Sequence, residues 1–311
     1  MNNKHFTIIT FYQFKKNFDK VKLSLELKNF CKYNKIKGTI LIADEGVNGT
    51  IAGLKKDVSN AVDILNKYSL SNLNLKFSFS KFMPFQKFKI KQKKEIVTLR
   101  TKYANPEIQT GERINFKVWN DLISDKKTML LDVRNDFEVQ MGSFKGAINP
   151  KTKNFTEFKD FVKTNLTEHK DKKIAMFCTG GIRCEKASSY LIAKGFRNVC
   201  QLDGGILKYL ENTPHAKSLW KGECFVFDGR VSLKNELKNG TYKMCHACRN
   251  PLSLKESNTK KYIPGVSCPK CFNKISYKKK KGLIERNKQI SIAKKKGTYN
   301  RYITQTVRDY E

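Results

Sequence analysis

The chain has 311 residues, of which 39% are hydrophobic and 29% are charged, and this length suffices for two or three domains with their own cores. No stretch approaches the roughly 20 apolar residues of a membrane span, and residues 1–20 lack the apolar centre of a secretory signal. We therefore expect a cytoplasmic protein without membrane segments. Its nine cysteines should then be mostly free thiols, catalytic groups or metal ligands.

The formal net charge of +34 is extreme. Lysine and arginine contacts to phosphates drive sequence-independent binding of nucleic acids, so this charge favours a polyanionic partner. The alternative is codon usage in an AT-rich genome, which would enrich Lys, Asn and Ile together. Neither interpretation bears on the fold.

The first domain is predicted to occupy residues 1–104 and to be ferredoxin-like. Apolar spacing predicts, in chain order, a strand, a helix, two strands, a helix and a strand, at residues 6–14, 21–33, 38–43, 50–52, 58–70 and 73–82. The turn at residues 44–49 is either a tight hairpin or a loop that faces RNA. Residues 88–100 are predicted to form a further strand whose basic face suits phosphate contacts, through Lys89, Lys91 and Lys93.

After a linker at residues 103–110, the pattern becomes α/β over residues 114–214. Strands are expected at residues 129–134, 147–148, 174–177 and 199–202, and helices at residues 118–123, 155–166, 185–194 and 207–211. This alternation predicts a parallel sheet covered on both faces.

The strand at residues 174–177 ends in a cysteine that is followed by a glycine-containing turn and a helix. Backbone N–H groups of the turn can surround the sulfur because glycine permits positive φ. Together with Arg183, they should lower the pKa of Cys178 and favour the thiolate. The loop residues are Cys178, Thr179, Gly180, Gly181, Ile182 and Arg183. The alternative is a small buried cysteine at a strand end.

This loop resembles the six-residue active-site loop of the rhodanese fold, with Cys178 in the persulfide-forming position. The longer string CTGGIRCEKAS resembles the rhodanese-domain tRNA uridine hydroxylases, and the resemblance runs from about Thr7 to about Cys271. Those enzymes make 5-hydroxyuridine at the wobble position of tRNA. The resemblance therefore implies tRNA as partner and molecular oxygen as co-substrate.

The rhodanese pattern also implies that Asp132, Arg134, Gly146-Ala147 and Gly204-Gly205 gather with the loop at the carboxyl ends of the strands. Asp132 and Arg134 would support the thiolate site, or Asp132 would cap the next turn. Cys184 is either a resolving thiol or a thiol without redox function. The chain has only four histidines, so backbone amides and Arg183, rather than a Cys–His dyad, should activate the thiol.

A small zinc-ribbon-like module is expected at residues 220–275. It begins with a predicted hairpin at residues 225–231 and contains a C-x2-C-x19-C-x2-C pattern, formed by Cys245, Cys248, Cys268 and Cys271. In a cytoplasmic chain this spacing predicts a closed, structural zinc site. A redox pair of C-x-x-C motifs and a site without metal are the alternatives.

Residues 276–311 form a basic tail with interspersed tyrosines. This composition suits RNA backbone contacts with some base stacking, for which Lys279, Lys280 and Lys295 are the candidates. The alternative is a solvated, disordered tail.

Three functions remain open from the sequence: a tRNA uridine hydroxylase, a sulfurtransferase that carries a Cys178 persulfide, and a non-catalytic RNA-binding thiol sensor. The sequence contains no pattern typical of an iron, flavin or dinucleotide centre that would activate oxygen. The electron donor, the subset of tRNAs and the oligomeric state are therefore left open.

Overall fold

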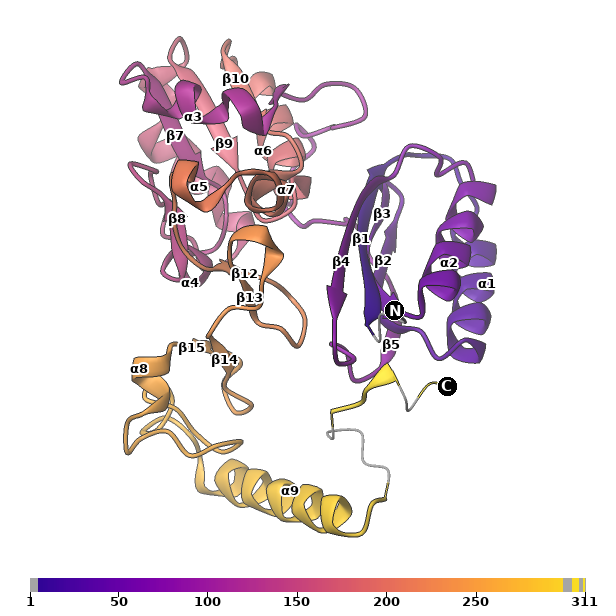
Figure 1. Cartoon of the computed structure of the whole chain (residues 1–311). Helices are drawn as coiled ribbons and strands as arrows, with labels where there is room; N and C mark the ends of the chain where they lie inside the picture. The colour runs from indigo at the N-terminus through magenta and orange to yellow at the C-terminus, as the bar shows by residue number, and fades with distance from the viewer. Residues whose placement is uncertain (1–4, 299–303, 308–309, 311) are drawn as a thin grey trace.

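The structure is a computed structural model that describes residues 5–298, 304–307 and 310. Figure 1 shows an N-terminal sheet with two helices on one face, a second α/β domain opposite the other face, and smaller C-terminal segments below. Among the described residues, no helix combines the length and apolar character needed to cross a membrane.

The N-terminal domain has the predicted ferredoxin-like arrangement. Its elements are β1 (Phe6–Phe14), α1 (Lys20–Tyr33), β2 (Lys37–Ala43), β3 (Gly46–Gly53), α2 (Lys55–Lys67), β4 (Asn74–Ser80) and β5 (Phe88–Gln92). The strand order is β4-β1-β3-β2-β5, and β5 pairs with β2 in parallel. The core lies between the sheet and the two helices, which leaves the opposite face of the sheet without helices.

Two strands differ most from their predicted lengths, each for a local reason. β3 begins at Gly46 rather than Thr50, because Gly46 pairs with Ala43 across a tight hairpin turn. β5 ends at Gln92 rather than Arg100, because the Glu95 carboxylate accepts hydrogen bonds from the backbone N–H groups of Leu99 and Arg100. These bonds turn the chain away from the sheet.

The second domain confirms the predicted parallel sheet, in the order β6-β10-β9-β7. Its elements are β6 (Glu112–Ile114), α3 (Phe116–Ser124), β7 (Thr128–Asp132), α4 (Asp136–Val139), β8 (Gly142–Phe144), α5 (Phe158–Asn165), β9 (Lys173–Phe177), α6 (Ile182–Ala193), β10 (Val199–Leu202) and α7 (Gly205–Asn212). Separate hydrophobic clusters cover the two faces of the sheet.

Three local predictions in this domain need correction. The expected strand at residues 147–148 is a single bridge between Ile148 and Leu131. The helix expected from Phe155 begins as a short 3-10 turn, and α5 starts at Phe158. Helix α6 starts at Ile182, three residues before the predicted start, so its first turn is part of the Cys178 loop.

The C-terminal segments tie the domains together. β11 (Trp220–Gly222) pairs with β8, and β12 (Cys224–Phe225) with β13 (Ser232–Leu233), which confirms the hairpin. β14 (Lys243–Met244), β15 (Pro251–Leu252) and α8 (Leu254–Ser257) precede α9 (Tyr277–Lys295). Residues 277–295 of the basic tail therefore form a helix. Beyond α9, Gln305 accepts a hydrogen bond from the backbone of Met83, so the chain returns to the N-terminal domain.

Candidate active site at the domain interface

Cys178 follows β9 directly and is only 1% exposed. The backbone N–H of Gly181 donates to its sulfur over 3.1 Å. Gly181 has a φ of +101°, which glycine adopts without strain, and α6 starts at the next residue. The sulfur therefore lies inside a turn of backbone amides at a helix N-terminus, an arrangement that favours a negative charge.

The N-terminal end of helix α7 binds the backbone of this loop. The backbone N–H of Ile206 donates to the carbonyl of Cys178 (2.9 Å), and that of Leu207 donates to the carbonyl of Thr179 (3.1 Å). Gly205, at a φ of +65°, permits this close approach, because a Cβ there would lie 2.5 Å from the carbonyl oxygen of Cys178. The Gly204-Gly205 segment thus lies beside the loop, as the resemblance implied.

The surroundings of Cys178 stabilise its thiolate. Burial alone would raise the pKa of Cys178, but hydrogen bonds from the Cys184 thiol and backbone and the charge of Arg183 outweigh burial and lower it to about 6. Burial and the hydrogen bond to Cys178 raise the pKa of Cys184 well above its usual value. At neutral pH, Cys178 is therefore the thiolate and Cys184 is the thiol that donates to it.

Arg183 is held by a carboxylate that the sequence analysis did not single out. Its guanidinium makes two bonds to Glu138, of 2.6 and 2.8 Å, and a third, of 3.1 Å, to the hydroxyl of Thr179. Glu138 is fully buried on α4 and also accepts the backbone N–H of Asn135. Asn135 and Glu138 have the spacing of a capping box. This spacing is the sequence signal from which a role for Glu138 could have been inferred.

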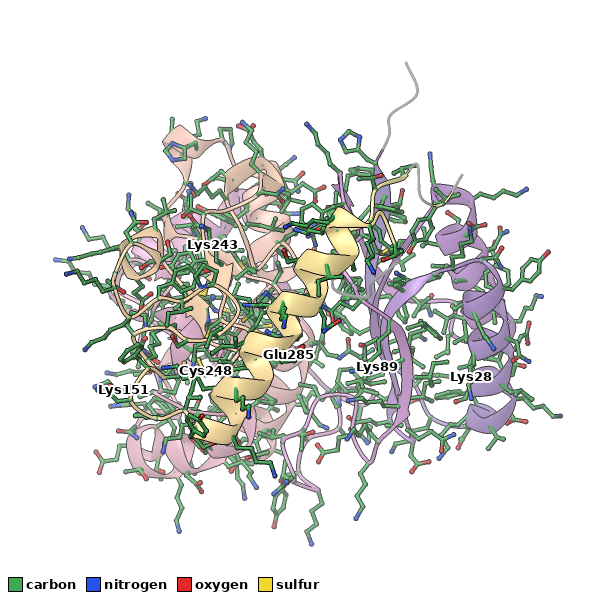
Figure 2. The ribbon with its side chains drawn as sticks, turned by 90° about the horizontal axis from the view of Figure 1, so that it is seen from below. Lys28, Lys89, Lys151, Lys243, Cys248 and Glu285 are labelled. Carbon is green, nitrogen blue, oxygen red and sulfur yellow. The ribbon has the colours of Figure 1, made fainter. Side chains whose placement is uncertain are left out.

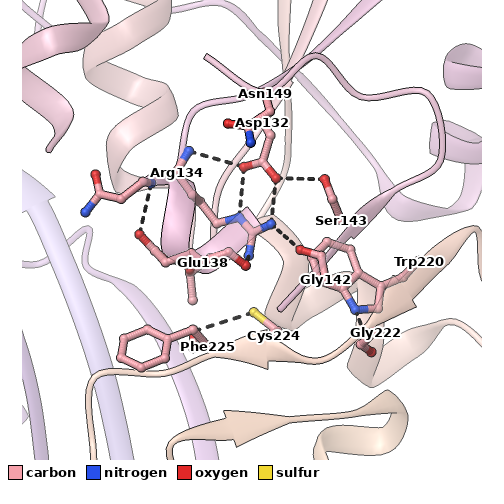
Figure 3. Close-up of polar contacts among 12 residues, drawn as sticks. Asp132, Arg134, Glu138, Gly142, Ser143, Asn149, Trp220, Gly222, Cys224 and Phe225 are labelled. Carbon is pink, nitrogen blue, oxygen red and sulfur yellow. Dashed lines mark hydrogen bonds and ion pairs between the residues drawn. The ribbon is translucent and has the colours of Figure 1, made fainter. Parts of the chain in front are cut away.

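Asp132 and Arg134 pair with each other rather than with Arg183. The guanidinium of Arg134 donates to the Asp132 carboxylate over 2.6 and 2.8 Å, and also to the carbonyl of Gly142 over 2.6 Å. It lies over the ring of Trp220, 5.1 Å from the ring centroid. Figure 3 shows this fully buried pair bracing β7 against the β8 segment. The guanidinium of Arg134 also donates to the backbone carbonyl of Glu138 over 3.4 Å, which connects this pair to the residue that holds Arg183.

The helix-free face of the N-terminal sheet covers the other side of the loop. Lys76 of β4 donates to the carbonyl of Gly180 over 2.7 Å, and the Tyr12 hydroxyl of β1 donates to Glu185 over 3.2 Å. Burial lowers the pKa of Lys76 to about 8, although the charge of Cys178 acts in the opposite direction. Two residues of another domain thus belong to the surroundings of Cys178.

A second contact between the domains is a buried lysine. Lys186 of α6 is 1% exposed, and its ammonium donates to Glu45 and Glu95 and to the carbonyl of Val97. Glu45 lies in the hairpin turn between β2 and β3. The sequence left open whether that turn is a tight hairpin or a loop that faces RNA. In the structure it is a tight hairpin that contacts the second domain.

The four cysteines of the C-x2-C pairs come together in one cluster. Their sulfur atoms all lie within 4.8 Å of one another, and Cys245–Cys271, Cys248–Cys268 and Cys268–Cys271 are 3.6 to 3.8 Å apart. Tetrahedral zinc with Zn–S bonds of about 2.3 Å needs sulfur atoms about 3.8 Å apart. Cys245, Cys248, Cys268 and Cys271 could therefore hold a zinc ion, whereas the adjacent His246 is exposed and is not in the cluster.

The predicted RNA-contact lysines are all exposed but lie in two places. Lys89 and Lys91 are on β5, and Lys93 follows it. Lys279, Lys280 and Lys295 are on α9. Figure 2 shows α9 running in front of the C-terminal module toward the N-terminal domain, with Lys89 on the side of that domain nearest the helix.

Comparison with known proteins identifies both large domains. Residues 6–96 match the UPF0176 acylphosphatase-like domain, and residues 117–212 match the rhodanese-like domain. Among solved structures, a rhodanese-related protein from Thermoplasma volcanium is 28% identical and covers 33% of this chain and 93% of its own, with a TM-score of 0.27. A rhodanese-like domain protein from Staphylococcus aureus is also 28% identical and covers 32% of this chain and 90% of its own, with a TM-score of 0.26.

The rhodanese-like match contains Cys178 and its loop, and the UPF0176 match contains Tyr12 and Lys76, which cover that loop. The chain therefore joins a UPF0176 acylphosphatase-like domain to a rhodanese-like domain, which is the architecture of the rhodanese-domain tRNA uridine hydroxylases.

Proposed function

We propose that the protein is a rhodanese-related enzyme that hydroxylates C5 of the wobble uridine in tRNA, in the cytoplasm, with Cys178 as the catalytic residue. The supporting observation is a thiolate loop, with the Cys178 pKa near 6, enclosed between a rhodanese-like domain and a UPF0176 domain. The net charge of +34 agrees with a tRNA substrate.

The reaction would consume uridine, molecular oxygen, two electrons and two protons, and would yield 5-hydroxyuridine and water. One oxygen atom enters the base and the other leaves as water. The electrons would come from an external reductant, because no group named at this site can supply them.

We further propose that the Cys178 thiolate adds to C6 of the uracil ring. This addition makes C5 electron-rich. The external reductant would reduce molecular oxygen to the peroxide level, C5 would attack one peroxide oxygen, and the O–O bond would break with the other oxygen leaving as water. Loss of the C5 proton and departure of the thiolate from C6 restore the ring. Arg183, fixed by Glu138, and the hydrogen bond from Cys184 would keep the sulfur anionic when it leaves.

The test is nucleoside mass spectrometry on tRNA from cells that carry the gene, lack it, or carry Cys178→Ser. We expect 5-hydroxyuridine and its derivatives to disappear in both altered strains. A Cys200→Ser strain is the matched control, because Cys200 is a buried cysteine on β10 and does not belong to the loop. Normal 5-hydroxyuridine in the Cys178→Ser strain would contradict the proposal.

A sulfurtransferase is the second candidate, and the amide-lined six-residue loop favours it. The Cys178 thiolate would take the outer sulfur of thiosulfate and release sulfite, and the resulting persulfide would pass that sulfur to a nucleophilic acceptor. Transfer of sulfur from thiosulfate to cyanide by the purified protein, lost in Cys178→Ser, together with unchanged tRNA nucleosides, would favour this function over hydroxylation.

A further inference from the structure

We propose that the helix-free face of the N-terminal sheet is a binding floor for single-stranded RNA, which leads a tRNA loop to Cys178. This inference rests on the proposed function and assigns the surface that receives its substrate. The floor is defined by two rows of residues that run across all five strands.

The strand registers place these rows. One row is formed by residues that are direct neighbours across the sheet, namely Lys76, Thr10, Thr50, Thr39 and Lys89. The next row, by the same pairings, contains Asn74, Tyr12, Asn48, Leu41 and Lys91. Direct neighbours in a sheet point to the same face. The alternate residues Ile9, Ile40 and Ile51 lie in the core under α1 and α2, so both rows point away from the helices.

The floor is mainly polar and, apart from the buried Tyr12 at the active-site end, partly exposed. Thr10, Thr39 and Thr50 are each half-buried, and the hydroxyls of Thr10 and Thr50 lie 3.1 Å apart. Adjacent strands are about 4.8 Å apart, so Lys76 and Lys89 lie about 19 Å from each other at opposite edges. This width accommodates a short length of single strand, whose ribose, base and phosphate groups the hydroxyls and ammonium groups can bind.

The strands of the floor contribute positive charge and no carboxylate; Glu185, which accepts the Tyr12 hydroxyl, belongs to α6 at the active-site end. None of the five strands contains an aspartate or a glutamate. The positive edge continues beyond the sheet. Lys87, just before β5, and Arg249, in the module that holds the four cysteines, lie close enough to Lys89 for their charges to act on it, as does Lys91 on the same strand. Burial, and after it these three charges, lower the pKa of Lys89. Like charges assembled from separate segments are a feature of polyanion sites.

The floor has a closed end and an active-site end. Beyond the threonine row, Ile8 and Ala52 are covered by Val307 and Met83, which close that end. At the other end, Tyr12 and Lys76 contact the helix and loop of Cys178. A single strand that binds Lys89 and Lys91 and crosses the threonines would therefore arrive at the catalytic loop.

The experiment measures binding of a fluorescent anticodon stem-loop RNA to the full-length protein. The variant is Lys89→Ala with Lys91→Ala, and the matched control is Lys28→Ala with Lys32→Ala, two exposed lysines on α1. Figure 2 shows Lys28 on the far side of the same domain from Lys89. With about 0.7 counterions released per single-strand phosphate contact, two lost contacts reduce the salt slope by about 1.4 and weaken binding roughly 25-fold at 0.1 M salt.

A third variant, Thr39→Glu, places a negative charge in the middle of the floor and should weaken binding further without removing a lysine. Equal affinities for the Lys89/Lys91 and Lys28/Lys32 variants would overturn the inference, as would binding of an acidic peptide in place of RNA. The same preparations are assayed for 5-hydroxyuridine in cells. If only the floor variants lose RNA affinity, the binding floor is supported. If the wild type also produces no 5-hydroxyuridine, the proposed hydroxylase function is refuted while the floor stands.

Discussion

The hydrogen bond from the Cys184 thiol makes a large favourable contribution to the acidity of Cys178, and its removal gives a quantitative prediction. Cys184→Ala removes the donor and leaves the backbone amides and Arg183 in place. A hydrogen bond to a charged group is worth about 1.5–3 kcal/mol, and 1.36 kcal/mol corresponds to one pKa unit. The pKa of Cys178 should therefore rise from about 6 to roughly 7–8.

The assay is the ultraviolet absorbance of the thiolate as a function of pH, taken as the difference between each protein and its Cys178→Ser counterpart. Cys184→Ser should keep the pKa near the wild-type value, because a hydroxyl also donates. Cys200→Ala controls for the loss of a buried thiol elsewhere in the sheet. An unchanged pKa in Cys184→Ala would refute the assignment of Cys184 as the donor.

The same thiolate links stability to pH. The pKa of Cys178 is lower in the folded protein than the ordinary value of about 8.5 expected for the unfolded chain. Its contribution to stability is therefore fully present above pH 8.5 or so and is lost as the pH falls through about 6. Denaturant unfolding should show the wild-type advantage over Cys178→Ser growing from pH 6 to 8.5, by as much as about 3 kcal/mol. A constant difference would contradict a thiolate in the folded state.

Three further outcomes follow from the contacts. Gly205→Ala should lower activity, and in denaturant unfolding it should lower the free energy of unfolding more than Gly146→Ala does. Both glycines have positive φ, but only Gly205 has backbone atoms within 3 Å of the added Cβ. Equal losses of unfolding free energy in the two variants would mean that the loop tolerates the clash. Lys186→Met should destabilise the protein by up to about 3 kcal/mol, because it leaves two carboxylates unpaired between the domains, whereas the exposed Lys172→Met should not. The wild type should contain one zinc per chain by elemental analysis and Cys268→Ser much less; metal-free wild type would contradict a zinc site.

The sequence was sufficient where a pattern is local. Apolar alternation predicted the main strands of both sheets, and the order of strands and helices predicted both fold classes. The loop around Cys178 was identifiable because strand, cysteine, glycines and helix follow one another within a few residues. The cysteine cluster was identifiable in the same way from its two C-x2-C pairs.

The partners of the loop were not predictable in this way. Tyr12 and Lys76 lie on strands of another domain, more than 100 residues before the loop, and alternation tells which face a residue is on but not what covers that face. Glu138 is on a helix of four residues, which is too short for a periodic signal. Helix α9 was interpreted as a basic tail because its lysines are spread around the helix rather than on one face.

The central claim, that the protein places an oxygen atom from molecular oxygen on a tRNA uridine, is tested most directly by isotope labelling. Cells that carry the wild-type gene, Cys178→Ser or no gene are grown under ¹⁸O₂, and their tRNA nucleosides are analysed by mass spectrometry. We expect ¹⁸O in 5-hydroxyuridine only with the wild-type gene. Unlabelled 5-hydroxyuridine in those cells, or labelled 5-hydroxyuridine in the cells that lack the gene, would contradict the account.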